Sequence, residues 1–139
     1  MVAKAALALA LYDRGRKKLL SFADVPGHEP IVTGLKIAML ADEIIVHSDY
    51  AIRTLERLYG VQFDRDRVVD TLKIAGQVRG KGGNSIAAWA TRLKIARDNY
   101  RGGAAWTPSV QKHAERDAMI ISRVLDHLLT TFDSTSREA

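Results

Sequence analysis

Basic side chains in two segments are the residues whose type and spacing best fit a chemical role in this sequence. Residues 1–22 hold five basic residues and one acidic residue, and residues 73–101 hold seven and one. The rest of the chain is net negative, although the whole has a formal charge of +5. Because a nucleic-acid backbone needs several cations close together, this sorting predicts a polyanionic partner. The residues expected to contact phosphates are Arg14, Arg16, Lys17, Lys18, Arg79, Lys81, Arg92, Lys94, Arg97 and Arg101.

A glycine-rich turn, Arg79-Gly-Lys-Gly-Gly-Asn84, stands inside the second basic segment. Glycines let backbone N–H groups approach a phosphate closely, and Arg79 and Lys81 add positive charge. The turn is not a P-loop, because its glycine and lysine spacing does not match that motif. We interpret it as a phosphate cradle, with a simple connector between helices as the alternative.

Aromatic residues are sparse near the basic segments, where only Tyr12, Tyr100 and Trp106 lie close. Trp89 falls on the apolar side of a predicted helix, which assigns it to the core. Stacking of bases needs exposed aromatic rings. We therefore expect contact with the phosphate backbone and little reading of base sequence.

Groups that could catalyse a reaction or bind a metal form no recognisable set. The chain has no cysteine, which excludes thiolate zinc sites and cysteine nucleophiles. His113 and Asp117 share one helix face, but a metal site needs a third ligand. Arg123 and His127 are interpreted as surface residues of an amphipathic helix. We expect no enzyme activity, no cofactor and no metal.

Apolar residues at spacings of three and four recur along the chain and predict helices. The expected fold class is all-α, a compact bundle of four to five helices in a single domain. Its parts are a basic N-terminal helix over 1–22, a Pro/Gly connector over 23–32, a helical bundle over 33–132 and a polar tail over 133–139.

Capping residues predict where the helices of the bundle begin and end. A helix over about 33–59 ends at Gly60, and the next opens after Asp64 or Asp66. Asn84 or Ser85 caps the one that follows, over about 85–100. The last is capped by Thr107, has Pro108 at its first position and runs to about residue 132. Connectors are expected at Asp24–Pro30, Gly80–Asn84 and Arg101–Trp106.

The size, the helical pattern, the absence of catalytic residues and the segregated basic charge resemble the small helical subunit of multi-subunit CRISPR effector complexes. The resemblance is architectural and covers most of the chain. It implies a non-catalytic subunit, present in several copies, whose basic surface supports the guide–target duplex or the displaced strand. The implied partners are nucleic acid, other protein subunits and copies of the chain itself, with RNA and DNA both open.

Two other functions fit the same residues. A filament-forming viral coat protein would use the basic first helix as an arm that wraps DNA, and an interaction module would use the apolar face of Met1–Leu11 against a protein. We expect no membrane association, because no apolar stretch reaches the roughly 20 residues needed to span a bilayer. The lack of cysteine fits the cytoplasm.

Overall fold

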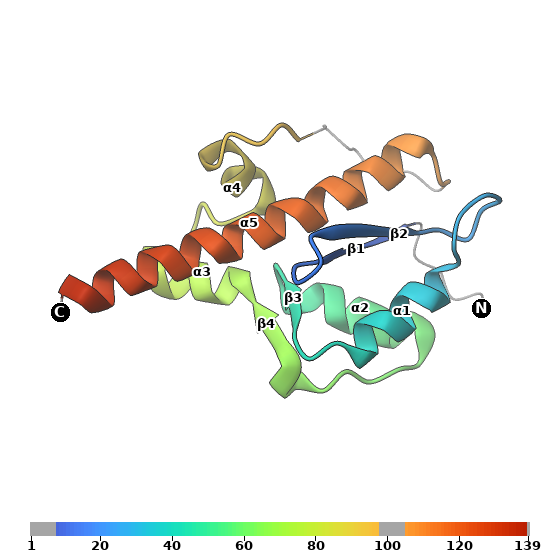
Figure 1. Ribbon diagram of the computed structural model, residues 1–139, viewed down its shortest axis with the longest axis horizontal. Helices are drawn as coiled ribbons and strands as arrows, with labels where there is room; N and C mark the ends of the chain where they lie inside the picture. Colours follow the sequence, from blue (N-terminus) through green and yellow to red (C-terminus); the bar gives the residue numbers. More distant parts are fainter. Residues whose placement is uncertain (1–7, 98–104, 139) are drawn as a thin grey trace.

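A β-hairpin comes first in the described chain, followed by a helix, a strand–helix–strand unit and three further helices (Figure 1). The computed structural model describes residues 8–97 and 105–138, the last seven of them by backbone alone. The elements are β1 (Leu9–Asp13), β2 (Lys18–Phe22), α1 (Ile31–Leu40), β3 (Ile44–Val46), α2 (Asp49–Tyr59), the 3₁₀ turn η1 (Arg65–Arg67), β4 (Val68–Asp70), α3 (Thr71–Arg79), α4 (Ile86–Arg92) and α5 (Pro108–Glu138).

The prediction of an all-α fold is wrong, because the chain combines helices with two small sheets. Residues 9–22 form the antiparallel hairpin β1–β2 in place of the predicted N-terminal helix. The helix predicted over 33–59 is divided into α1, β3 and α2. Helical propensity in the leucine–alanine run is overridden because the hairpin packs against both α1 and α5. The β-branched run Ile44-Ile-Val46 prefers an extended strand.

The hairpin and α1 approach each other closely at Gly34. A Cβ atom at this position would stand 2.5 Å from Cδ2 of Phe22 and 2.9 Å from Cδ2 of Leu9. Phe22 itself is buried. Only glycine leaves room for the hairpin to pack here, so a side chain at Gly34 would push α1 off β1 and β2.

β3 and β4 are parallel neighbours joined through α2, with Ile44 opposite Val68 and Val46 opposite Asp70. Ser48 caps α2 by accepting a hydrogen bond from the Tyr50 amide. Gly60 ends α2 in the left-handed conformation, as predicted. Asp70 in turn caps α3, so each strand leads into a capped helix. The prediction that this helix opens after Asp64 or Asp66 is wrong, because Asp64 caps η1 and β4 follows before α3 begins.

α4 and α5 begin where the capping residues indicate. Ser85 accepts a hydrogen bond from the Ala88 amide, and Thr107 accepts one from the Val110 amide. α4 ends at Arg92, earlier than predicted, whereas α5 continues to Glu138 and includes most of the predicted polar tail. The connectors predicted at Asp24–Pro30 and Gly80–Asn84 are confirmed as non-helical, and most of the third lies outside the described residues.

α5 runs obliquely across the molecule and packs against β1, β2, β3, α3 and α4 (Figure 1). Within the described ranges, no helix has the length and apolar character needed to cross a membrane.

Two clusters of buried side chains lie beneath these elements. The α5 core joins α3, α4 and α5 and centres on Trp89 and Ile120. The β3 core joins α1, β3, α2 and the following loop and includes Ile52 and Phe63. The α5 core therefore supports the second predicted basic segment, and the β3 core supports the acidic part of the chain.

Candidate nucleic-acid interface

Arg14 tethers the turn of the hairpin to α5. Its Nη1 donates to the carbonyl and hydroxyl oxygens of Ser122, each at 2.8 Å, and its Nη2 lies 2.6 Å from Oδ1 of Asp126. Arg14 was expected to bind phosphate, but its guanidinium is used within the protein. The tether instead fixes where the other basic residues of the turn lie.

Arg16, Lys17 and Lys18 are the exposed cations of the hairpin turn. Arg16 has 84% of its side chain exposed and approaches Asp13 at 3.8 Å, a distance that leaves it largely available. Lys17 has a positive φ of 54°, which turns the chain back into β2. Because Arg14 holds the turn at Ser122 and Asp126, these lysines stand beside the outer face of α5.

Arg97 is a second tether, on the other side of α5. Its Nε and Nη2 donate to the two carboxylate oxygens of Asp117 at 2.9 and 3.2 Å, and 27% of its side chain is exposed. Nη1 of Arg116 also donates to the carbonyl of Ala96 at 2.7 Å. Like Arg14, Arg97 is therefore engaged within the fold, whereas its neighbour Lys94 is exposed.

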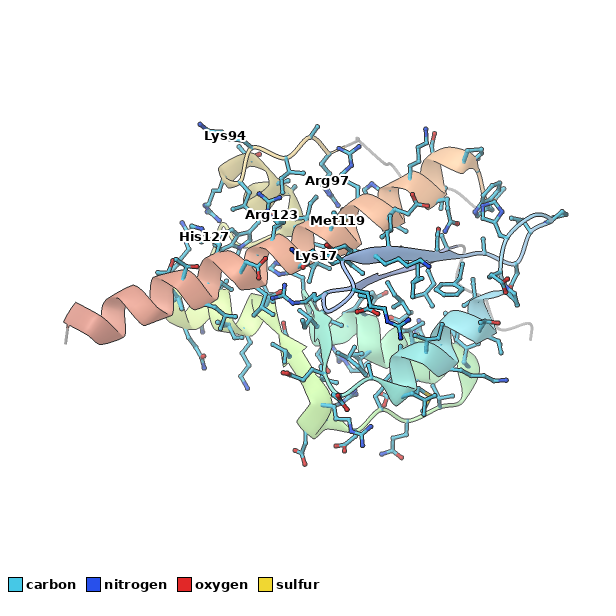
Figure 2. All side chains as sticks on the ribbon, in the orientation of Figure 1. Lys17, Lys94, Arg97, Met119, Arg123 and His127 are labelled. Atoms are coloured by element: carbon cyan, nitrogen blue, oxygen red, sulfur yellow. The ribbon has the colours of Figure 1, made fainter. Side chains whose placement is uncertain are left out.

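One face of α5 lies between these two tethers and presents Arg116, Met119, Arg123 and His127 at helical spacing. Figure 2 shows six residues of this region, from the hairpin turn, the segment after α4 and α5: Lys17, Lys94, Arg97, Met119, Arg123 and His127.

We call Lys17, Lys94, Arg123 and His127 the basic surface. In the part of the chain that the structure describes, Lys17, Lys94 and Arg123 form no ion pair. Arg123 and His127 were not predicted to bind phosphate. The signal available in the sequence was their spacing from Arg116 on the exposed face of one helix.

Two carboxylates of α5 are already neutralised, Asp126 by Arg14 and Asp117 by Arg97. Their charge therefore does little to offset the positive field of the exposed cations. Arg14 and Arg97 thus contribute to the basic surface without contacting a ligand themselves.

The glycine-rich turn is held by hydrogen bonds of Asn84. Its buried side chain accepts from Nη1 of Arg79 at 2.8 Å and donates to the carbonyl of Gly80 at 2.9 Å. The buried imidazole of His47 contacts the Asn84 carbonyl with Nε2 and Thr71 Oγ1 with Nδ1. The turn is therefore a defined structure connected to β3, while Lys81 remains exposed on it.

Trp89 is fully buried, in agreement with its assignment to the core, and charged side chains cover it. The guanidinium carbons of Arg79 and Arg92 lie 5.6 and 5.0 Å from its ring centroid. The His127 ring meets it edge-on at 5.4 Å. Arg79 and Arg92, both predicted to contact phosphate, thus pack on the same indole. Their positions in the sequence do not reveal this arrangement.

A separate hollow of about 430 Å³ lies beside β4, lined in part by Asp49, Arg65, Asp70 and Lys73. Both of its carboxylates have structural partners. Asp49 pairs with Arg53 at 3.1 Å, and Asp70 accepts the amides of Leu72 and Lys73. Both carboxylates of this hollow are therefore engaged in contacts within the fold.

His113 and Asp117 are 3.3 Å apart, as their shared helix face predicts, and both belong to the Arg97 tether. Across residues 8–97 and 105–138, no group of three or more metal-binding side chains is found. Arg101, the last predicted phosphate ligand, lies outside the described residues.

Neither a protein-family model, nor a curated protein, nor a solved structure matches this chain. The resemblance to the small CRISPR subunit stays a prediction from the sequence. The function is therefore inferred from the arrangement of charged side chains.

Proposed function

We propose that this protein is a non-catalytic subunit of a ribonucleoprotein assembly that binds the backbone of a nucleic acid on its basic surface. The observation that carries the proposal is that Lys17, Lys94 and Arg123, from three separate segments, lie in one region of the molecule (Figure 2) and form no ion pair with any described residue. A phosphate backbone supplies the repeated negative charge that such a surface lacks.

Binding through phosphates fits the shortage of aromatic rings on this surface. Trp89 is buried, and Trp106 is half-buried with its Nε1 donating to Gln111 at 2.9 Å. Tyr50 is exposed but belongs to α2, beside the acidic part of the chain. Since no exposed tryptophan, tyrosine or phenylalanine ring among the described residues of this surface offers a stacking platform, affinity would depend on charge and salt, with little preference for base sequence.

An apolar stripe on α1 supports the assembly part of the proposal. Val32, Ile37 and Leu40 are exposed, Leu40 by 83%. Exposed apolar side chains grouped on one helix face suit contact with a protein neighbour, either another subunit or a second copy. The coat-protein alternative needs a helical N-terminal arm, and residues 9–22 form a docked hairpin instead. A cytoplasmic location belongs to the same proposal.

The experiment removes two cations of the basic surface together, Lys17→Gln with Arg123→Gln. Fluorescence anisotropy would measure affinity for RNA and DNA oligonucleotides of unrelated sequence over a salt series. Loss of two phosphate contacts should weaken binding by roughly 10- to 30-fold near 0.15 M salt and reduce the salt slope by about 2. The factor should be similar for all sequences.

A matched control removes the same charge elsewhere, Arg53→Gln with Arg67→Gln, because these arginines lie near Asp49 and Asp64. It should change affinity by less than about twofold, since each arginine is already partly neutralised. Equal losses for the two double variants would show that only net charge matters and would contradict the assigned surface. Failure of the parent protein to bind either nucleic acid at low salt would contradict the function.

Self-association provides the test of the α1 stripe. Leu40→Glu should lower the molar mass measured by light scattering, or release the chain from its assembly, whereas Arg57→Glu, at an exposed position of α2, should have less effect. If the protein is an interaction module without a nucleic-acid role, Leu40→Glu should reduce its association. Lys17→Gln with Arg123→Gln should then have no effect.

A further inference from the structure

A second group of cations surrounds the glycine-rich turn, next to the basic surface. We call Arg79, Lys81, Gly83 and Arg92, together with Trp89 on which both arginines pack, the turn cluster. His127 packs edge-on against Trp89, so it belongs to the basic surface and also borders this cluster. The two groups are therefore continuous on the molecule.

The two arginines of the turn cluster are held together without a neutralising acid. Each guanidinium lies over the Trp89 ring, and neither pairs with a carboxylate among the described residues. Contact with the ring face offsets only part of the repulsion between like charges. A bound anion would supply the negative charge that both guanidinium groups lack.

Backbone donors are available at the same place. In the described structure, the amides of Lys81, Gly82 and Gly83 donate no hydrogen bond. Gly82 and Gly83 have positive φ values of 92° and 67°, a conformation that can group successive amides into an anion-binding concavity. A Cβ atom on Gly83 would stand 3.1 Å from Nη2 of Arg92, so a guanidinium nitrogen lies against the turn itself.

We propose that the turn cluster binds a single phosphate monoester group, the terminal phosphate of a nucleic-acid strand lying on the basic surface. This inference rests on the proposed function. A strand that follows α5 from Arg116 toward His127 reaches the turn cluster, because His127 contacts Trp89. A terminal phosphate has more charge and more acceptor oxygens than an internal phosphodiester, which suits two guanidinium groups and several free amides.

The first test uses inorganic phosphate and the Trp106→Phe variant, in which Trp89 is the only tryptophan. Trp89 fluorescence and the amide NMR signals of Gly82 and Gly83 should change saturably with phosphate at constant ionic strength. Arg79→Gln with Arg92→Gln should abolish the glycine shifts in a protein that circular dichroism shows to be folded. Absence of any response beyond that to chloride would overturn the proposal.

The second test identifies the source of the phosphate. An oligonucleotide with a 5′- or 3′-phosphate should bind about tenfold tighter than the same sequence with a hydroxyl end, a gain of about 1.4 kcal/mol. The Arg79 and Arg92 double variant should lose this preference. A phosphate response without any preference for phosphorylated ends would overturn the strand-end assignment and indicate a small phosphate compound.

The two proposals can fail separately. The Lys17 and Arg123 double variant should bind oligonucleotides weakly yet keep the full response to inorganic phosphate. Unchanged oligonucleotide binding by this variant would contradict the basic surface and leave the turn cluster standing. If the double variant loses oligonucleotide affinity as expected but the parent protein shows no response to inorganic phosphate, only the proposal for the turn cluster is contradicted.

Discussion

Near α2, Arg53, Arg65 and Arg67 stand beside carboxylates, whereas the cations of the basic surface form no ion pair with a described residue. Arg53 lies 3.1 Å from Asp49, and Arg65 lies 2.7 Å from Glu56. On the basic surface, Lys17 and Arg123 form no ion pair with a described residue. Both regions contain several basic residues, so the number of cations does not distinguish them.

The difference lies in which arginines neutralise nearby acids. Arg14 and Arg97 pair with Asp126 and Asp117 and so neutralise two carboxylates of α5. The positive charges of the lysines and Arg123 are then offset less by these acids. A cation in the right segment can therefore serve binding indirectly, by occupying a carboxylate that would otherwise repel the ligand.

The largest expected effect comes from Trp89→Ala, which removes the core side chain beneath the turn cluster. Loss of this fully buried indole should lower the free energy of unfolding by about 3–5 kcal/mol. Urea denaturation followed by circular dichroism would measure it. Tyr50→Ala, at an exposed position on α2, should stay within about 0.5 kcal/mol as the control. A loss below about 1 kcal/mol for Trp89→Ala would show that the α5 core does not support this surface.

The next effect concerns the Arg14–Asp126 pair, where two variants should separate stability from binding. Arg14→Gln and Asp126→Asn each break the tether, and Arg14→Gln, which also loses its bonds to Ser122, should destabilise by about 1–3 kcal/mol. Their effects on oligonucleotide affinity should be opposite, each about twofold, because one leaves an unpaired acid and the other removes it. Changes of affinity in the same direction would show that the tether acts only by positioning the hairpin.

A smaller effect, restricted to acid, is expected at Glu56 in the paired region. A hydrogen bond from the Phe63 amide at 2.9 Å, with Arg65 adding to it, lowers the pKa of Glu56 below its ordinary value of 4.5. The ionised carboxylate therefore stabilises the fold fully at pH values above the ordinary pKa. This contribution to stability is lost as the pH falls through the lowered pKa.

Urea denaturation between about pH 6 and pH 3 measures this loss. The parent protein should lose stability on acidification more steeply than Glu56→Gln. The exposed Glu43→Gln should follow the parent protein. Parallel curves for parent and Glu56→Gln would show that the contact with Phe63 does not favour the charged form.

Most helix ends could be predicted from the sequence, because capping depends on neighbouring residues, but the cap of α3 is Asp70 and not Asp64 or Asp66. Gly60, Ser85, Thr107 and Pro108 mark helix ends in the structure as they do in the sequence. The strands were missed because β3 and β4 have three residues each, too few to show an alternating pattern. The β1–β2 hairpin was missed because its extended form depends on packing against α1 and α5, which are distant in sequence.

The candidate site was predictable in charge but not in geometry. The segments containing Lys17 and Lys94 were identified from composition alone. No sequence pattern showed that Arg14 and Arg97 would pair with acids of α5, or that Arg92 would lie over Trp89. Such pairings depend on contacts between residues distant in the sequence, and a count of charged residues does not reveal these contacts.

The tether from Arg14 to Ser122 joins residues 108 positions apart, and this separation affects the order of folding. On the ribosome, the hairpin emerges long before α5 is made. The apolar face of the hairpin therefore stays uncovered until α5 is available to pack against it. The faces of α3 and α4 that pack on α5 also stay uncovered until α5 is made. We expect this part of the chain to fold only after α5 has left the exit tunnel and to need protection from aggregation until then.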